Sequence, residues 1–108
     1  MDERSQLAVF NKTISENYNI EIEDFMEAYF VFCKLPQEDK NVALKWFEVG
    51  NQGIGLTDKL KDFNAKLKLK LDIDIDEFLD TYLYFTELSN DTRTLIIKEN
   101  IKKESTEW

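Results

Sequence analysis

Two copies of one pattern lie 53 positions apart in this chain. Residues 20–35 read IEIEDFMEAYFVFCKL, and residues 73–88 read IDIDEFLDTYLYFTEL. When the two stretches are aligned without a gap, similar apolar residues coincide, and these pairs are Ile20/Ile73, Phe25/Phe78, Tyr29/Tyr82, Phe32/Phe85 and Leu35/Leu88. The similarity continues into the flanking residues at the same offset. The sequence therefore predicts a tandem duplication of one helical unit, with repeats at 1–53 and 54–106.

The repeated pattern has the features of a buried helix with a defined start. In the second copy, Asp74 can act as the N-cap, and Glu77 can complete a capping box three residues later. In the first copy the N-cap position is held by Glu21, which is a poorer cap. Aromatic residues then recur at i, i+4 and i+7, and in the first copy other apolar residues surround this stripe. A helix that is apolar on nearly all sides is usually buried, so we expect these two helices at the centre.

Two more helices are expected in each unit. Apolar residues at i, i+3 and i+7 predict a first helix over 5–17, and its copy should begin after a Thr57 N-cap. The alternating residues 66–75 could also form a strand, but a single strand would have no partner. A third helix should follow Pro36 and, in the second copy, Ser89. The prediction is an all-α fold, a compact helical bundle of about six helices built from a three-helix unit.

Length and glycine placement indicate one domain. The 108 residues can bury a moderate core, and 43% of them are hydrophobic. All three glycines fall within residues 50–55, which we interpret as a short linker between the units. A three-helix unit of about fifty residues is only marginally stable alone, so the two copies should pack together. The whole chain, 1–108, is therefore predicted to be a single domain.

Charge and composition narrow the classes of function. The formal net charge of −8 disfavours direct contact with nucleic acid, which needs clustered Lys and Arg. No apolar run is long enough to cross a membrane, and the acidic N-terminus does not resemble a signal peptide, so no membrane partner is expected. The single cysteine, Cys33, indicates a reducing, cytoplasmic location. Its apolar surroundings predict a buried structural thiol.

No catalytic residue, metal or cofactor is predicted. The acidic run 72–77 invites a calcium interpretation, but an EF-hand loop starting at Asp72 would need glycine in place of Glu77 and Glu in place of Leu83. Helix capping already accounts for Asp74 and Glu77. The chain has no histidine that could activate Cys33, so a nucleophilic enzyme is also disfavoured.

The two copies differ informatively near the end of the third helix. Trp46 and Phe47 align with Glu99 and Asn100, so two large apolar residues in the first copy correspond to two polar residues in the second. Val42 lies one helical turn before Trp46 and extends the apolar strip. Aromatic anchors are enriched at interface hot spots, so we predict a partner-binding site at these three apolar residues. The alternative is that the two aromatic residues fill the seam between the copies.

A second candidate surface is acidic. Carboxylates of the repeated helices could stand in for the phosphates of DNA and compete for a basic cleft on another protein. The residues that would form this surface are Asp72, Asp74, Asp76, Asp80, Glu23 and Glu27. Binding through them should weaken steeply as ionic strength rises, whereas an aromatic-anchored interface should weaken less.

A resemblance to a known family bears on function. Residues 25–48, FMEAYFVFCKLPQEDKNVALKWFE, and residues 78–100, FLDTYLYFTELSNDTRTLIIKEN, resemble the helical hairpin of repressors of the xenobiotic-response-element class from phages and mobile elements. In those repressors the hairpin follows the DNA-binding domain and serves oligomerisation or inducer binding. The chain has no basic recognition helix, so the resemblance implies a regulatory partner rather than an operator-binding repressor.

The predicted function is therefore a non-enzymatic, protein-binding regulator. It would act as an antirepressor or inhibitor from a phage or mobile element, and the alternative is an acidic DNA mimic. The expected partner is another protein, such as a DNA-binding repressor or a nuclease. Association of the chain as a homodimer is compatible with this function.

Overall fold

The computed structural model describes residues 2–50 and 55–100, which form six α-helices and no strand. The helices are α1 (Glu3–Tyr18), α2 (Ile22–Cys33), α3 (Gln37–Glu48), α4 (Asp58–Leu71), α5 (Ile75–Glu87) and α6 (Asn90–Asn100). For these residues the prediction of an all-α bundle is confirmed. Within the described ranges, no helix is both long enough and apolar enough to cross a membrane. Most of the predicted linker, residues 51–54, lies outside the described residues.

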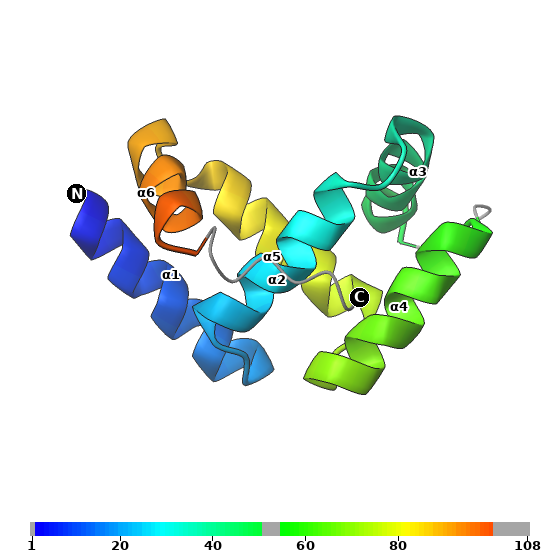
Figure 1. Ribbon diagram of the computed structural model, residues 1–108, viewed down its shortest axis with the longest axis horizontal. Coiled ribbons are helices and arrows are strands. Elements are labelled where there is room, and N and C mark those ends of the chain that lie inside the picture. Colours follow the sequence, from blue (N-terminus) through cyan, green and yellow to red (C-terminus); the bar gives the residue numbers. More distant parts are fainter. Residues whose placement is uncertain (1, 51–54, 101–108) are drawn as a thin grey trace.

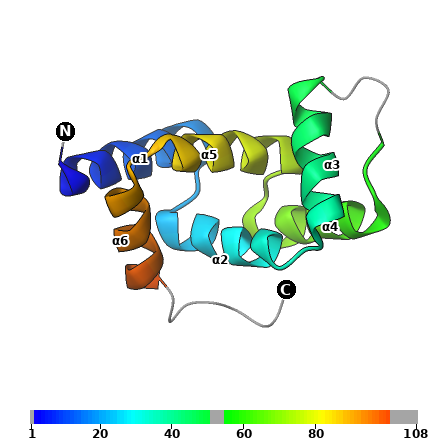
Figure 2. The same cartoon turned by 90° about the horizontal axis from the view of Figure 1, so that it is seen from above.

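The helices form two layers that are closed at both ends (Figures 1 and 2). α1 and α5 lie side by side in one layer, and α2 and α4 lie in the other. α2 and α5 cross at the centre of the molecule, where the sequence placed the two repeated helices. α6 lies across one end of the layers, and α3 lies across the other end.

The third helix of each half packs against the other half of the chain. α3 lies against α4 and α5, and α6 lies against α1 and α2. At one end, Thr57 Oγ1 donates to Asp39 Oδ1 at 2.6 Å, which joins α3 to the start of α4. At the other end, Gln6 Oε1 accepts from the backbone N–H of Ser89 at 3.1 Å, which joins α1 to the start of α6. The sequence predicted that the halves would pack together. It did not predict that the third helix of each half packs against the other half.

Capping residues set several of the helix ends. Asp74 is the N-cap of α5, and its Oδ1 accepts from the backbone N–H of Glu77 at 3.2 Å. Glu77 Oε1 accepts in return from the Asp74 backbone N–H at 3.3 Å, so the predicted capping box is confirmed. Glu21, the poorer cap, makes no such side-chain bond. α1 and α4 both end at a left-handed residue with φ of 56°, Asn19 and Asp72, which are residue types that tolerate this conformation.

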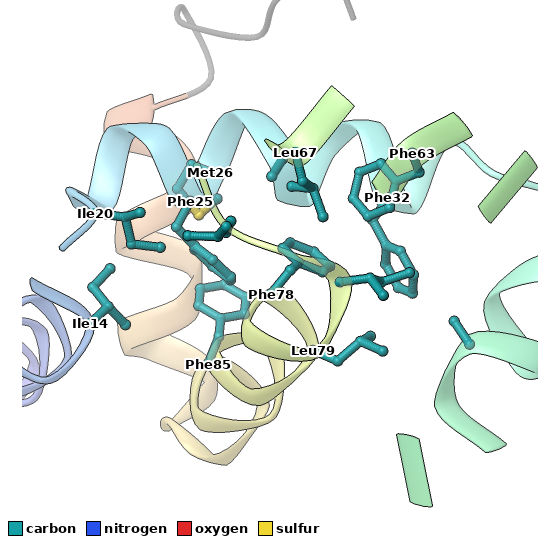
Figure 3. Packing of buried hydrophobic residues seen from close by; sticks show 14 of the residues in the cluster. Ile14, Ile20, Phe25, Met26, Phe32, Phe63, Leu67, Phe78, Leu79 and Phe85 are labelled. Atoms are coloured by element: carbon teal, nitrogen blue, oxygen red, sulfur yellow. The ribbon is translucent and has the colours of Figure 1, made fainter. Parts of the chain in front are cut away.

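Aromatic rings from α2 and α5 form the centre of the core (Figure 3). Phe25 and Phe78 are fully buried and stack with their ring centroids 5.8 Å apart. Phe85 lies 5.6 Å from Phe25, and Phe32 lies 5.3 Å from Phe78, again between ring centroids. All six helices contribute buried apolar side chains around these four rings. Ring pairs at such distances add stability beyond the area that they bury.

Helix boundaries and buried residues recur at the offset found in the sequence. α2 begins at Ile22 and α5 at Ile75, and α3 begins at Gln37 and α6 at Asn90. The buried apolar pairs at this offset are Phe10/Phe63, Ile14/Leu67, Ile20/Ile73, Phe25/Phe78, Met26/Leu79, Phe32/Phe85 and Ala43/Ile96. Backbone geometry and burial thus follow the same period as the amino-acid pattern.

We expect Phe25→Ala and Phe78→Ala each to lower the free energy of unfolding by about 3–5 kcal/mol, the usual cost of removing a buried Phe ring. Leu69→Ala is the matched control, because Leu69 is 83% exposed, and its loss should change stability by less than about 0.5 kcal/mol. Urea unfolding followed by circular dichroism measures all three variants. A core variant as stable as the control would show that the α2–α5 crossing is not central to the fold.

Candidate functional site

A hollow of about 340 Å³ lies where α1 and α3 end beside the start of α5. Its lining residues are Tyr18, Phe47, Asp76, Glu77 and Asp80, and we name it the Phe47 hollow. Both aromatic side chains are partly buried and pack against the core, so their positions are fixed. The hollow places one predicted aromatic site residue, Phe47, beside two predicted acidic ones, Asp76 and Asp80.

Helix capping divides the acidic residues of this region into two groups. Asp74 and Glu77 form the capping box of α5, and Asp72 occupies the left-handed position that ends α4. Asp76 and Asp80 are four residues apart on α5 and therefore share one face of that helix. These two residues supply the carboxylates of the hollow that do not serve as caps.

The surroundings of Asp76 favour contact with a cation. Asp76 is exposed, but slight desolvation raises its pKa, and the nearby Asp74 carboxylate adds to the rise. A Lys or Arg side chain brought by a partner would offset the cost of holding negative charge there. The aromatic rings of Tyr18 and Phe47 line the same hollow and could add a cation–π attraction.

Two further hollows continue along α5 from the Phe47 hollow. Asp80 also lines the second hollow, together with Leu83, Tyr84 and Glu87. Tyr84 and Glu87 also line the third, of about 290 Å³, which side chains of α1, including Val9, complete. We name the second and third hollows together the α1–α5 groove.

The other residues of the predicted aromatic site lie deeper. Trp46 is 9% exposed and belongs to the buried cluster, and Val42 is partly buried against that cluster. Because α3 packs on α4 and α5, Trp46 lies between the two halves of the chain. Its counterpart Glu99 is at the surface, where it pairs with Arg4 at 3.2 Å. This arrangement favours the alternative that Trp46 fills the seam, and it leaves Phe47 as the aromatic residue that reaches a hollow.

The remaining residues of the predicted acidic surface lie on another helix. Glu23 and Glu27 are half-buried on α2, at the positions equivalent to Asp76 and Asp80. The Phe47 hollow does not include them. The structure therefore brings Asp76 and Asp80 together in one hollow, with Asp74 in the turn that precedes them.

The sequence prediction for Cys33 is wrong. Cys33 is exposed at the last residue of α2, because this end of the helix reaches the surface. Partial desolvation still raises the pKa of the Cys33 thiol, although a hydrogen bond with Tyr29 and the charge of Lys40 act in the opposite direction. A thiol with a raised pKa is a poor nucleophile at neutral pH, so this correction does not make Cys33 a catalytic candidate.

Two other features of the surface do not form a comparable site. No group of three or more His, Cys, Asp or Glu side chains within residues 2–50 and 55–100 is arranged to hold a metal ion. An open hollow of about 570 Å³ lies at the starts of α1 and α6, but all of its lining residues are polar. One of them, Asp2, is already used as the N-cap of α1, where it accepts from the Ser5 N–H at 2.8 Å. Neither place offers the mixture of aromatic and acidic groups that the Phe47 hollow provides.

Sequence reasoning missed the apolar residues of the α1–α5 groove. Val9 aligns with Asp62, which pairs with Lys66 at 3.1 Å on the surface of α4. An apolar residue in one copy thus replaces a solvated ion pair in the other. The comparison between copies that singled out Trp46 would have found Val9 by the same criterion.

Comparisons of the chain with protein-family models, with curated proteins and with solved structures gave no match. The resemblance of residues 25–48 and 78–100 to a repressor hairpin therefore stays a prediction. The function of the chain has to be inferred from the chemistry of its own surface.

We expect Trp46→Glu, which copies the residue of the second half, to lower the free energy of unfolding by at least about 3–5 kcal/mol. The reason is that the change removes a buried indole and leaves a carboxylate in the core. Phe47→Asn, which copies Asn100, should cost less because Phe47 is only partly buried. Urea unfolding followed by circular dichroism compares the two. Unchanged stability of Trp46→Glu would exclude seam packing and restore Trp46 as a candidate surface anchor.

Proposed function

We propose that this protein is a non-enzymatic regulator that works by occupying the surface of another protein. The observation that carries the proposal is the Phe47 hollow, where two aromatic rings and the carboxylates of Asp76 and Asp80 share one concave surface. A shallow hollow lined by aromatic rings and carboxylates can contact one side chain of a partner, and its charges favour a cationic one. The anchor that fits is a Lys or Arg side chain, which can stack on a ring and pair with a carboxylate.

The class of regulator that we propose is an antirepressor or inhibitor from a phage or mobile element. Its partner would be a DNA-binding repressor or a nuclease. Proteins of these kinds bind nucleic acid through clustered Lys and Arg, and a chain with a net charge of −8 is complementary to such a surface. The resemblance of residues 25–48 to a repressor hairpin supports the same class.

An acidic DNA mimic remains the alternative. The equivalent positions of α2 and α5 both carry carboxylates, with Glu23 and Glu27 matching Asp76 and Asp80. A mimic would use both pairs as phosphate substitutes and would need no aromatic residue between them. Tyr18 and Phe47 within the hollow therefore favour the anchored interface over mimicry.

We also propose that the chain arose by tandem duplication of a three-helix unit, with repeats at 1–53 and 54–106. Support comes from the starts of α2 and α5 and of α3 and α6, from the left-handed caps and from buried side chains, which recur at one offset. The packing supports it further, because the contact of α3 with α4 and α5 has its counterpart in the contact of α6 with α1 and α2. In such an arrangement a site present in only one half, such as the Phe47 hollow, must come from residues in which the copies differ.

The experiment uses this protein as bait in a lysate of its native host, with mass spectrometry to identify the captured protein and calorimetry to measure its affinity. Asp76→Asn combined with Asp80→Asn should weaken binding about tenfold, which corresponds to about 1.4 kcal/mol. The matched control is Asp58→Asn combined with Asp62→Asn on α4, which removes the same charge at the same spacing and should leave affinity unchanged.

Two outcomes would contradict the proposal. Equal weakening by both double variants would show that only net charge matters. A further, equal loss on changing Glu23 and Glu27 to Gln, together with a steep fall in affinity as salt rises, would favour the DNA mimic.

A further inference from the structure

The large apolar side chains most exposed in the described residues fall on two faces of the molecule. Val9, Leu83 and Tyr84 are 53%, 38% and 42% exposed, and all three line the α1–α5 groove. Leu69 is 83% exposed and lies on α4. Apolar side chains gathered at one exposed groove indicate an interaction site.

The α1–α5 groove is also acidic. Asp80 and Glu87 flank Leu83 and Tyr84 along α5, at spacings that place all four on one face of the helix. None of the described residues that line the groove is Lys or Arg. A segment that fits this groove must therefore present apolar and cationic groups together.

The outer part of α4 has that complementary chemistry. Lys68 and Lys70 flank Leu69 in the last turn of α4 and are exposed, whereas Lys66, one turn earlier, pairs with Asp62. The helix as a whole carries five Lys against two Asp, although the protein is acidic. Long lysine side chains can also lay their apolar stems beside a leucine while their charged ends reach a carboxylate.

α4 lies in the opposite layer from α1 and α5, whose side chains line the groove (Figure 2). The Leu69 face of α4 therefore cannot reach the groove of its own copy, but it can reach that of a second copy. Two unlike faces on one molecule give a heterologous contact, in which each pair of copies still has one face of each kind left over.

We propose that copies of this protein associate through these two faces, with the Leu69 face of α4 from one copy docked in the α1–α5 groove of the next. Leu69 packs against Leu83 and Tyr84, and the lysines around it meet Asp80 and Glu87. The net charge of −8 opposes association at long range, but at physiological ionic strength charges further apart than about 8 Å are largely screened. The two faces meet at shorter range, where their charges are opposite in sign.

Sedimentation velocity of the full chain over a wide range of concentrations tests this proposal. The average mass should rise with concentration, and Tyr84→Ala and Leu69→Ala should each weaken association at least about tenfold. Lys45→Ala, at an exposed position of α3 outside both faces, is the control and should associate like the wild type. Because Tyr84 and Leu69 are exposed, both variants should keep the thermal unfolding of the wild type, which circular dichroism checks.

Mixing the two variants gives the sharpest result. Tyr84→Ala keeps an intact α4 face and Leu69→Ala keeps an intact groove, so an equimolar mixture should form dimers and nothing larger. A wild type that stays monomeric at every concentration overturns the proposal, as does association that neither variant weakens or that the mixture fails to restore. None of these failures touches the proposed function, which rests on the affinity of a different protein for the Phe47 hollow.

Discussion

The stacking of Phe25 on Phe78, where α2 crosses α5, is the contact on which the rest of the structure depends. These rings come from the two halves of the chain, so the centre of the core forms only when both halves are folded together. The third helices also require both halves to fold together, because α3 covers α4 and α5 while α6 covers α1 and α2. Neither half therefore completes this core without the other.

The same crossing determines where a binding surface can arise. The buried face of α5 carries Phe78 and Phe85, and its outer face carries Asp80 and Tyr84. The buried face must match its counterpart in α2, because both contribute equivalent rings to one core. The outer face has no such constraint. Surfaces that could bind partners therefore lie where the copies diverge, as at Phe47 beside the end of α3 and at Val9 on α1.

Much of the fold could be predicted from the sequence because local signals and the repeat agree. The capping box at Asp74 and the period of the aromatic stripe both place α5 correctly. The packing of α3 and α6 on the opposite half could not be predicted. Helical periodicity identifies the buried side of α3 without identifying what covers it. For the same reason the sequence selected Trp46 as a surface anchor beside the alternative of seam packing, and burial favours the seam. The exposure of Cys33 could not be predicted, because the apolar pattern of α2 does not show that this end of the helix reaches the surface.

Site-specific photo-cross-linking in the native host tests most directly whether the Phe47 hollow receives a different protein, as we propose. The photoreactive amino acid p-benzoylphenylalanine would replace Phe47 in one variant and Thr94, at an exposed position of α6, in the control. We expect a light-dependent adduct with one basic protein from position 47 and no such adduct from position 94. An adduct of equal yield from position 94, or none from position 47 while the protein still binds its partner, would contradict the proposed function.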